Sequence, residues 1–194
     1  MKQKKTLKLL NIVFLSIIGL SFAVILFFAY QYLLAYPTPF KGQISACSKE
    51  YSLNPCLVYA VIKTESSFNK KAVSNKGAKG LMQITDGTGE YIANKIGVES
   101  YNLLNENDNI RFGCYYLRYL INKFKSLNTA LAAYNAGEGR VRCWLKNSAY
   151  CQDGINLTTI PYIETAEYIK KITKTLNKYQ KLYGNIVDKS VKKK

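Results

Sequence analysis

The feature that most constrains this chain of 194 residues is a stretch near its N-terminus without charge. No charged residue occurs from Leu9 to Phe40, and residues 12–29 are almost wholly apolar. Such a segment is long enough to cross the hydrocarbon core of a membrane as a helix. Four lysines precede it, so the positive-inside rule predicts a cytoplasmic N-terminus and export of everything that follows.

A cleaved signal peptide is the competing interpretation, because it has the same basic start and apolar middle. Ser21 and Ala23 have the spacing of a cleavage site but lie inside the apolar run, and the lipoprotein-like sequence at residues 44–47 lies too far downstream. We therefore expect an uncleaved anchor. The expected parts are a cytoplasmic basic N-terminus (1–8), a transmembrane anchor (9–36), a folded domain (41–185) and a basic tail (186–194).

The composition restricts the chemistry of the folded domain. The chain has no histidine, so it cannot hold a Ser-His-Asp triad, a Cys-His pair or a zinc ion ligated by histidine. Carboxylate chemistry is therefore favoured. The formal net charge of +16 predicts attraction to anionic surfaces such as phospholipids or wall polymers. Nucleic acid would also match the charge, but the export signal argues against it.

Apolar residues recur at helical spacing along most of the remaining chain, and strand-like alternation of useful length is missing. Asn54 followed by Pro55 is typical of a helix start. Residues 69–89 predict a loop with a small hairpin, and residues 100–108 an irregular connection. The fold class we expect is mainly α. The expected helices cover residues 44–51, 54–68, 90–96, 110–124 and 129–135, and a last one starts at residue 162.

Glu65 stands out because it occupies an apolar stripe. Val58, Val61, Ile62 and Glu65 lie at i, i+3, i+4 and i+7 of the expected helix. A carboxylate buried there must be paired, or it must carry a raised pKa and keep its proton, as a general acid does. The simpler alternative is that Glu65 lies in the last turn and points to solvent beside Lys63.

Four sequence motifs follow one another along the chain. They are Glu65-Ser66-Ser67-Phe68-Asn69 with Ala72-Val73-Ser74, then residues 77–84, 133–141 and 161–169. In this order and spacing they resemble the catalytic domain of the soluble-type lytic transglycosylases, relatives of goose-type lysozyme that cleave peptidoglycan. The resemblance covers about residues 44–172 and implies a lysozyme-like single catalytic domain behind the N-terminal transmembrane helix.

The resemblance also implies a mechanism that needs one carboxylate and no metal or cofactor. In this family a single glutamate protonates the leaving oxygen and then accepts a proton from the C6 hydroxyl of N-acetylmuramic acid, with assistance from the N-acetyl group. This resolves a difficulty of the sequence, because glycosidases normally use two carboxylates. Asp86, Glu90 and Glu138 lie near the motifs but at no spacing that pairs them with Glu65.

Carried over by position, the resemblance assigns Glu65 as the catalytic acid and base. Glu164 matches a buried acid of the closing helix, which would orient Tyr134 or the substrate. Each residue also has a simpler explanation. Tyr134 could be a buried tyrosine that only satisfies a hydrogen bond, and Glu164 could be a first-turn acid that the helix dipole favours. The implied substrate-binding residues are Ser66, Met82, Gln83, Tyr134, Asn135 and Glu164.

Three functions are consistent with these features. The first is a membrane-anchored lytic transglycosylase that cleaves the bond between N-acetylmuramic acid and N-acetylglucosamine and leaves 1,6-anhydro products. The second is a hydrolytic muramidase of the same fold, in which Asp86 or another acid holds a water. The third is an inactive wall-binding scaffold module of a secretion or division assembly.

The sequence also leads to expectations about partners and compartment. The expected partners are glycan strands of peptidoglycan and, through the N-terminal helix, the membrane; a secretion or division machinery is a further candidate, and nucleic acid is not expected. The expected location is the bacterial cytoplasmic (inner) membrane, with a single pass and the domain on the periplasmic or extracellular side.

Five cysteines in an exported domain predict disulfides. Cys143 and Cys151 are close in sequence, and we expect a bridge between them. Cys47, Cys56 and Cys114 lie on or beside apolar helix faces, where they are either paired or simply small buried residues. The sequence does not choose among their pairings.

Overall fold

The computed structural model describes the backbone of residues 2–192 and the side chains of residues 10, 11 and 14–184. The chain forms two compact units, residues 1–38 and residues 39–194. The side chains of the expected cytoplasmic N-terminus (1–8) and basic tail (186–194) lie outside the described set.

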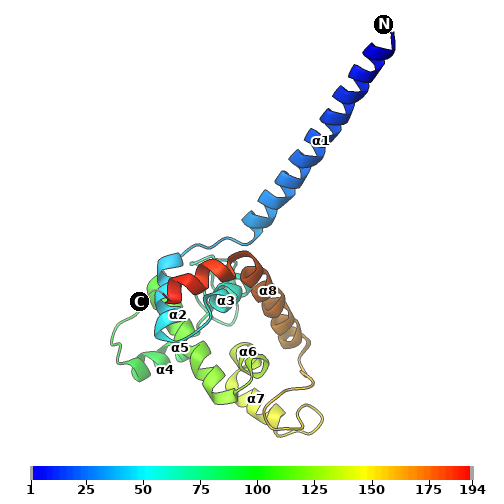
Figure 1. Cartoon of the computed structure of the whole chain (residues 1–194). Coiled ribbons are helices and arrows are strands. Elements are labelled where there is room, and N and C mark those ends of the chain that lie inside the picture. Colours follow the sequence, from blue (N-terminus) through cyan, green and yellow to red (C-terminus); the bar gives the residue numbers. More distant parts are fainter. Residues whose placement is uncertain (1, 193–194) are drawn as a thin grey trace. The chain divides into compact units, whose positions relative to one another are not determined.

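The first unit is dominated by one helix, α1 (Lys2–Ala35), drawn in blue in Figure 1. Its described side chains are almost all exposed. Within the described residues, Phe14–Ala35 is the one helical segment long and apolar enough to cross a membrane, with a mean hydropathy of 2.1. Membrane anchors and signal sequences share these properties.

The second unit is built from helices, as the sequence predicts. Residues 39–192 form no strand, and their only β-type pairings are three isolated bridges. Two of these bridges join Val73 to Lys79 and Lys79 to Ile84, within the loop between the second and third helices of this unit. The helices are α2 (Lys41–Glu50), α3 (Pro55–Ser66), α4 (Asp86–Ile96), α5 (Glu106–Phe124), α6 (Leu127–Ala136), α7 (Glu138–Leu145) and α8 (Ile163–Lys192).

Helix α3 lies at the centre of this unit, between α2 and α8 in the view of Figure 1, and packs most extensively against α8. Its first eight residues are all buried. The predicted start is confirmed, since the Asn54 side chain accepts a hydrogen bond from the Cys56 amide at 2.8 Å. The expected extension to Phe68 is wrong, because Ser67 and Phe68 have left-handed backbone conformations (φ of 50° and 67°) that end the helix at Ser66.

Helix α6 is short, rich in alanine and buried, as its small side chains predict. Residues 129–133 are fully enclosed, and α6 contacts α5, α7 and α8. Gly137 ends the helix with a φ of 91°, a conformation that residues with a side chain rarely adopt. Because α6 packs against three neighbouring helices, the polar residues that it carries are held in fixed positions.

Helices α4 and α5 each begin four residues earlier than predicted, and helix α7 was not predicted at all. Helix α4 begins at Asp86 instead of residue 90, because the Thr85 side chain caps it by accepting from the Thr88 amide. Helix α5 begins at residue 106, where Asn105 is the N-cap. Helix α7 was not predicted, because only Val141 and Trp144 are buried in its eight residues and such a pattern is too short to detect.

The predicted disulfide between Cys143 and Cys151 is wrong. All five cysteines lie in the described part of the chain, and none forms a disulfide. Cys143 is exposed on α7, whereas Cys151 is buried and its thiol donates to the Asp153 carboxylate at 3.4 Å. The two side chains therefore face different surroundings despite their short separation in sequence.

Candidate active site

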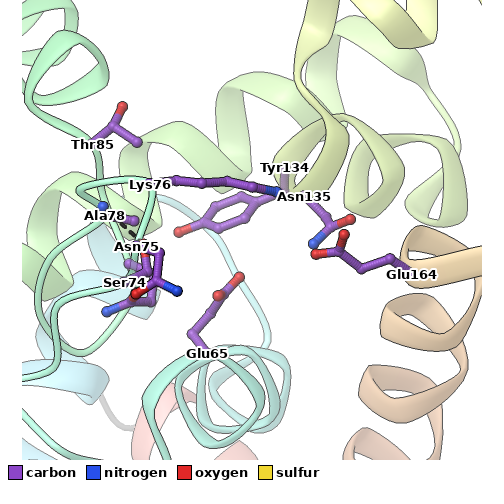
Figure 2. A pocket seen from close by; sticks show the side chains of 10 residues that line it. Glu65, Ser74, Asn75, Lys76, Ala78, Thr85, Tyr134, Asn135 and Glu164 are labelled. Carbon is purple, nitrogen blue, oxygen red and sulfur yellow. Dashed lines mark hydrogen bonds between the residues drawn. The ribbon is translucent and has the colours of Figure 1, made fainter. Parts of the chain in front are cut away.

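A cavity of about 350 Å³ opens around Glu65, where α3, α6, α8 and the loop between α3 and α4 meet (Figure 2). The structure thus brings together five of the seven residues expected at the site. Ser66 and Met82 are not among the lining residues. The lining consists of Glu65, Ser74, Asn75, Lys76, Ala78, Gln83, Thr85, Tyr134, Asn135 and Glu164.

Glu65 lies in the last turn of α3, half-buried, with its carboxyl group pointing into this cavity (Figure 2). Burial raises the pKa of Glu65 from 4.5 to about 7, because the surrounding protein disfavours the charged form. A hydrogen bond from the Tyr168 hydroxyl and the positive charge of Lys171 act in the opposite direction. Glu65 is thus a half-buried acid on the otherwise apolar face of α3, and its pKa suits a group that both gives and takes a proton near neutral pH.

Tyr168 reaches Glu65 from α8, 103 residues further along the chain. Its hydroxyl donates to Glu65 Oε1 at 2.5 Å, and its ring is buried with 9% of its surface exposed. Because Oε1 accepts this bond, Oε2 is the oxygen left to carry the exchangeable proton. The sequence prediction missed this role, although Tyr168 lies four residues after Glu164 and therefore near it on α8.

Tyr134 forms the opposite wall of the cavity (Figure 2). Its hydroxyl donates to the Met82 carbonyl at 2.8 Å, which ties α6 to the loop. Burial, with the neighbouring Glu65 as the next cause, raises the pKa of Tyr134 well above its usual range. Tyr134 therefore acts here as a neutral hydrogen-bonding group.

The side chain of Met82 does not face the cavity, contrary to the expected contact with sugars. It is completely buried and occupies space above Gly113, where a Cβ atom would collide with it. Its amide donates to Asn109 Oδ1 at 2.7 Å, while its carbonyl accepts from Tyr134. Met82 therefore shapes the site through its backbone.

Ser66 also serves the architecture of the site. Its hydroxyl lies 2.9 Å from the Leu81 carbonyl and 3.2 Å from the Ile62 carbonyl, and it can donate to either. The first contact joins the end of α3 to the loop that carries Gln83. Ser66 is therefore placed to hold the loop beside Glu65.

Asn109 on α5 fixes the same loop from the other side. Its side chain is 1% exposed and donates to the Lys79 and Leu103 carbonyls at 2.9 and 2.8 Å. Gly80 has a φ of 75°, and a Cβ atom there would collide with the Asn109 amide and the Leu103 carbonyl. Asn109 thus satisfies three backbone groups that would otherwise be buried without partners.

Glu164 lies at the rim of the cavity, in the first turn of α8. It is exposed, so the expectation of a buried acid is wrong: the first turn of α8 faces solvent there. Figure 2 shows its carboxylate pointing toward Asn135. The side-chain oxygen Oδ1 of Asn135 accepts a hydrogen bond from the Thr165 hydroxyl at 2.7 Å, and this bond orients the side-chain amide of Asn135.

The other acids considered from the sequence are engaged elsewhere. Asp86 pairs with Lys79 at 2.7 Å, and Glu138 pairs with Lys123 at 2.6 Å and accepts from Tyr119. Neither lines the cavity, and neither does Glu90. Among the described residues, Glu65 and Glu164 are the two carboxylates of this cavity.

A second hollow of about 420 Å³ continues from the first. The two share five lining residues, so they are adjoining parts of one cleft. The second part adds Thr88, Tyr116 and Arg140, and the Arg140 guanidinium group lies over the ring of Tyr162. A cleft of this kind, with hydroxyl, amide and aromatic groups, suits an extended polar polymer. The shared residues are Lys76, Gln83, Thr85, Tyr134 and Asn135.

Comparison with known proteins places this cleft in a family. The sequence profile described as "Transglycosylase SLT domain" matches residues 43–154, more than half of the chain. The chain belongs to the transglycosylase SLT domain family. The matched segment contains Glu65, Tyr134 and Asn135 but ends before α8, which supplies Tyr168 and Glu164.

Relatives of this SLT domain protein are lytic transglycosylases. It is 34% identical over 143 residues to the soluble lytic murein transglycosylase of Salmonella typhimurium, which covers 71% of this chain and 22% of the relative. It is 30% identical over 165 residues to the membrane-bound lytic murein transglycosylase C of Salmonella arizonae, with coverages of 72% and 46%. The chain thus spans between about a fifth and a half of the length of these relatives.

The fold is shared with a solved structure. An inactive mutant of lytic transglycosylase Slt from Pseudomonas aeruginosa matches this SLT domain protein with a TM-score of 0.67 and 32% identity. The match covers 76% of this chain and 25% of that chain. The mainly α, lysozyme-like fold predicted from the sequence is therefore confirmed.

Proposed function

We propose that this protein is a lytic transglycosylase that cleaves glycan strands of peptidoglycan, with Glu65 as its acid and base. The observation that carries the proposal is the half-buried carboxyl group of Glu65, which points into the cleft and has a pKa of about 7. Membership of the SLT domain family and the names of the relatives support the same reaction.

In the first step, protonated Glu65 gives its proton to the oxygen that leaves the anomeric carbon of N-acetylmuramic acid, and the glycosidic bond breaks. The carboxylate that remains is stabilised by the Tyr168 hydroxyl. In the second step, the C6 hydroxyl of the same sugar attacks its anomeric carbon and passes its proton to Glu65. The ring closes to a 1,6-anhydro sugar, no water is consumed, and the glutamic acid is restored.

The surroundings of Glu65 favour this reaction over hydrolysis. An inverting hydrolase needs a second carboxylate that activates water, and a retaining hydrolase needs one as a nucleophile. The only other carboxylate of the described cavity, Glu164, is exposed at the rim and points toward Asn135. Gln83, Tyr134 and Asn135 are the groups that we expect to hold the sugars.

Matched substitutions of the two cavity carboxylates test the proposal. Glu65→Gln keeps the shape of the side chain but cannot exchange a proton, so cleavage of purified peptidoglycan should fall roughly a hundredfold to ten-thousandfold. Glu164→Gln, the control, should retain most of the activity. An equal loss in both variants would indicate a two-carboxylate hydrolase, and activity retained in Glu65→Gln would contradict the assignment of Glu65.

We also propose that α1 anchors the protein in the cytoplasmic membrane, with residues 39–194 on the outer side. The apolar segment Phe14–Ala35 and the membrane-bound relative support this placement. A C-terminal reporter that is active only after export should then be active, and the full chain should stay with membranes after an alkaline wash. A soluble mature product would contradict the anchor, and a reporter active only in the cytoplasm would contradict the orientation.

A further inference from the structure

The second part of the cleft is lined by positive charge alone. Among the described residues that line it, Lys76 and Arg140 are the charged ones, and none is a carboxylate. The first part, in contrast, contains Glu65 and Glu164 beside Lys76. The charge of the lining therefore changes along the cleft, from mixed around Glu65 to wholly positive in the adjoining hollow.

Arg140 is held in position by two contacts. Its Nη1 donates to the Ala136 carbonyl at 2.9 Å, and its guanidinium group lies over the ring of Tyr162, 5.0 Å from the ring centre. Glu138, two residues before it, pairs with other cations and does not line the cleft. Because a guanidinium group has five N–H donors, Arg140 keeps donors for a ligand after it has bonded to Ala136.

Lys76 enters the cleft from the loop between α3 and α4. Ser74 closes the turn that carries it: its carbonyl accepts from the Gly77 amide at 2.9 Å, and its hydroxyl oxygen accepts from the Ala78 amide at 3.1 Å. Lys76 lines both parts of the cleft, and Figure 2 shows its side chain extending from the loop toward Asn135. It therefore lies where the two parts adjoin.

Neither cation is neutralised by the protein itself. In the part of the chain that the structure describes, the ion pairs involve other lysines and arginines and leave out Lys76 and Arg140. Like charges that line one hollow repel each other, and a bound anion relieves this repulsion. A lysine beside an arginine suits a carboxylate, because the arginine can bind both of its oxygens through parallel hydrogen bonds.

We propose that Lys76 and Arg140 form a subsite for a carboxylate that the glycan strand carries as a side group. The subsite rests on the proposed function and specifies its substrate further: the cleft prefers acidic strands of peptidoglycan to uncharged strands of N-acetylglucosamine. Two groups of peptidoglycan have this chemistry. One is a carboxylate of the stem peptide. The other is the lactyl carboxylate of N-acetylmuramic acid, which is free only where no peptide is attached.

Binding of soluble glycan fragments to the full chain in detergent tests the subsite, with Glu65→Gln as the background that prevents cleavage. Three fragments of equal glycan length are compared: one with stem peptides, one with the same stems after their carboxylates are converted to amides, and one without stems. The first or the third should bind roughly tenfold more tightly than the amidated fragment. Tight binding of the first identifies the stem peptide as the source of the carboxylate, and tight binding of the third identifies the lactyl group.

Three substitutions in this background separate the subsite from the general attraction of a chain with a net charge of +16. Lys76→Gln should reduce the preference for the tighter fragment over the amidated one roughly threefold to tenfold. Arg140→Lys keeps the charge but not the parallel donors, and it should reduce the preference as well. Lys71→Gln, the control, removes one exposed positive charge from the same loop outside the cleft and should leave the preference unchanged.

Two outcomes would overturn the subsite while the proposed function stands. One is equal affinity for all three fragments. The other is an equal fall of the preference in Lys76→Gln and Lys71→Gln, which would assign it to the net charge of the protein. A chain that binds none of the fragments would contradict the subsite and the proposed function together, so the two failures can be told apart.

Discussion

At the scale of single residues, the pKa of Glu65 results from opposing influences. Burial disfavours its charge, while the Tyr168 hydroxyl and Lys171 favour it. The balance, a pKa of about 7, leaves the carboxyl group protonated in part of the molecules at neutral pH. A residue that must first donate and then accept a proton needs this balance, and Tyr168 is the group that adjusts it most directly.

Tyr168→Phe should move the pH dependence of cleavage. The substitution removes the hydrogen bond that lowers the pKa of Glu65, so the pKa should rise above 7. Activity needs the protonated form, and its decline at high pH should therefore shift upward by about one pH unit. Rates of wall lysis between pH 5 and 9 measure this shift. Tyr119→Phe, which removes a hydroxyl bonded to Glu138, is the control and should leave the decline in place.

An unshifted decline in Tyr168→Phe, with a lower rate at every pH, would contradict this role. It would indicate that Tyr168 supports the fold around Glu65 without influencing its proton.

Glu65→Gln should stabilise the protein in a pH-dependent manner. The folded-state pKa of Glu65 is raised from 4.5 to about 7, so between these values the folded chain binds more protons than the unfolded chain. Unfolding free energy therefore falls as pH rises through this window, and the penalty is complete above pH 7. Glutamine does not titrate, so the variant avoids this penalty. Its advantage over the wild type in unfolding free energy should be about 1 to 3 kcal/mol larger at pH 8 than at pH 5. Urea unfolding at the two pH values measures the gain; the same difference at both would contradict the raised pKa.

At the scale of elements, the loop between α3 and α4 forms one wall of the site. Ser66 holds its backbone from α3, Tyr134 from α6 and Asn109 from α5. Since three helices fix one loop, its position depends on the packing of the whole unit. Asn109 makes the most hydrogen bonds of the three residues, because its side-chain amide bonds to three backbone groups.

Asn109→Asp should weaken both stability and cleavage. The carboxylate can still accept from Met82, but it cannot donate to the Lys79 and Leu103 carbonyls and would face them with a buried charge. We expect a loss of about 2 to 4 kcal/mol in unfolding free energy and at least a tenfold loss of lysis. Asn107→Asp, in an exposed position of the same helix turn, should change neither. Thermal unfolding and a lysis assay on both variants check this; wild-type behaviour of Asn109→Asp would contradict it.

Local patterns in the sequence predicted most of the helices. The Asn54–Pro55 start of α3, the amphipathic spacing of α5 and the small side chains of α6 each act within a few residues. Helix α7 and the early start of α4 were missed because a short helix and a threonine cap leave weak signals. These errors concern one short helix and the ends of others, and they leave the helical class of the fold unchanged.

At the scale of the whole molecule, the site could be predicted only in part. The motifs located Glu65, Tyr134 and Asn135 correctly in one cavity. They could not show that Tyr168 meets Glu65 or that Met82 turns its side chain into the core. Each of these contacts joins residues far apart in the sequence, so no local spacing encodes it.

The measurement that tests the central claim most directly is mass analysis of the muropeptides released from purified peptidoglycan by the full chain. If the C6 hydroxyl displaces the leaving group and Glu65 handles both protons, the wild type should release mainly 1,6-anhydro products. Each of these is lighter by one water than the product of hydrolysis. The Glu65→Gln variant should release none above background. Wild-type products with reducing ends throughout would contradict the transglycosylase and would instead establish a muramidase on the same fold.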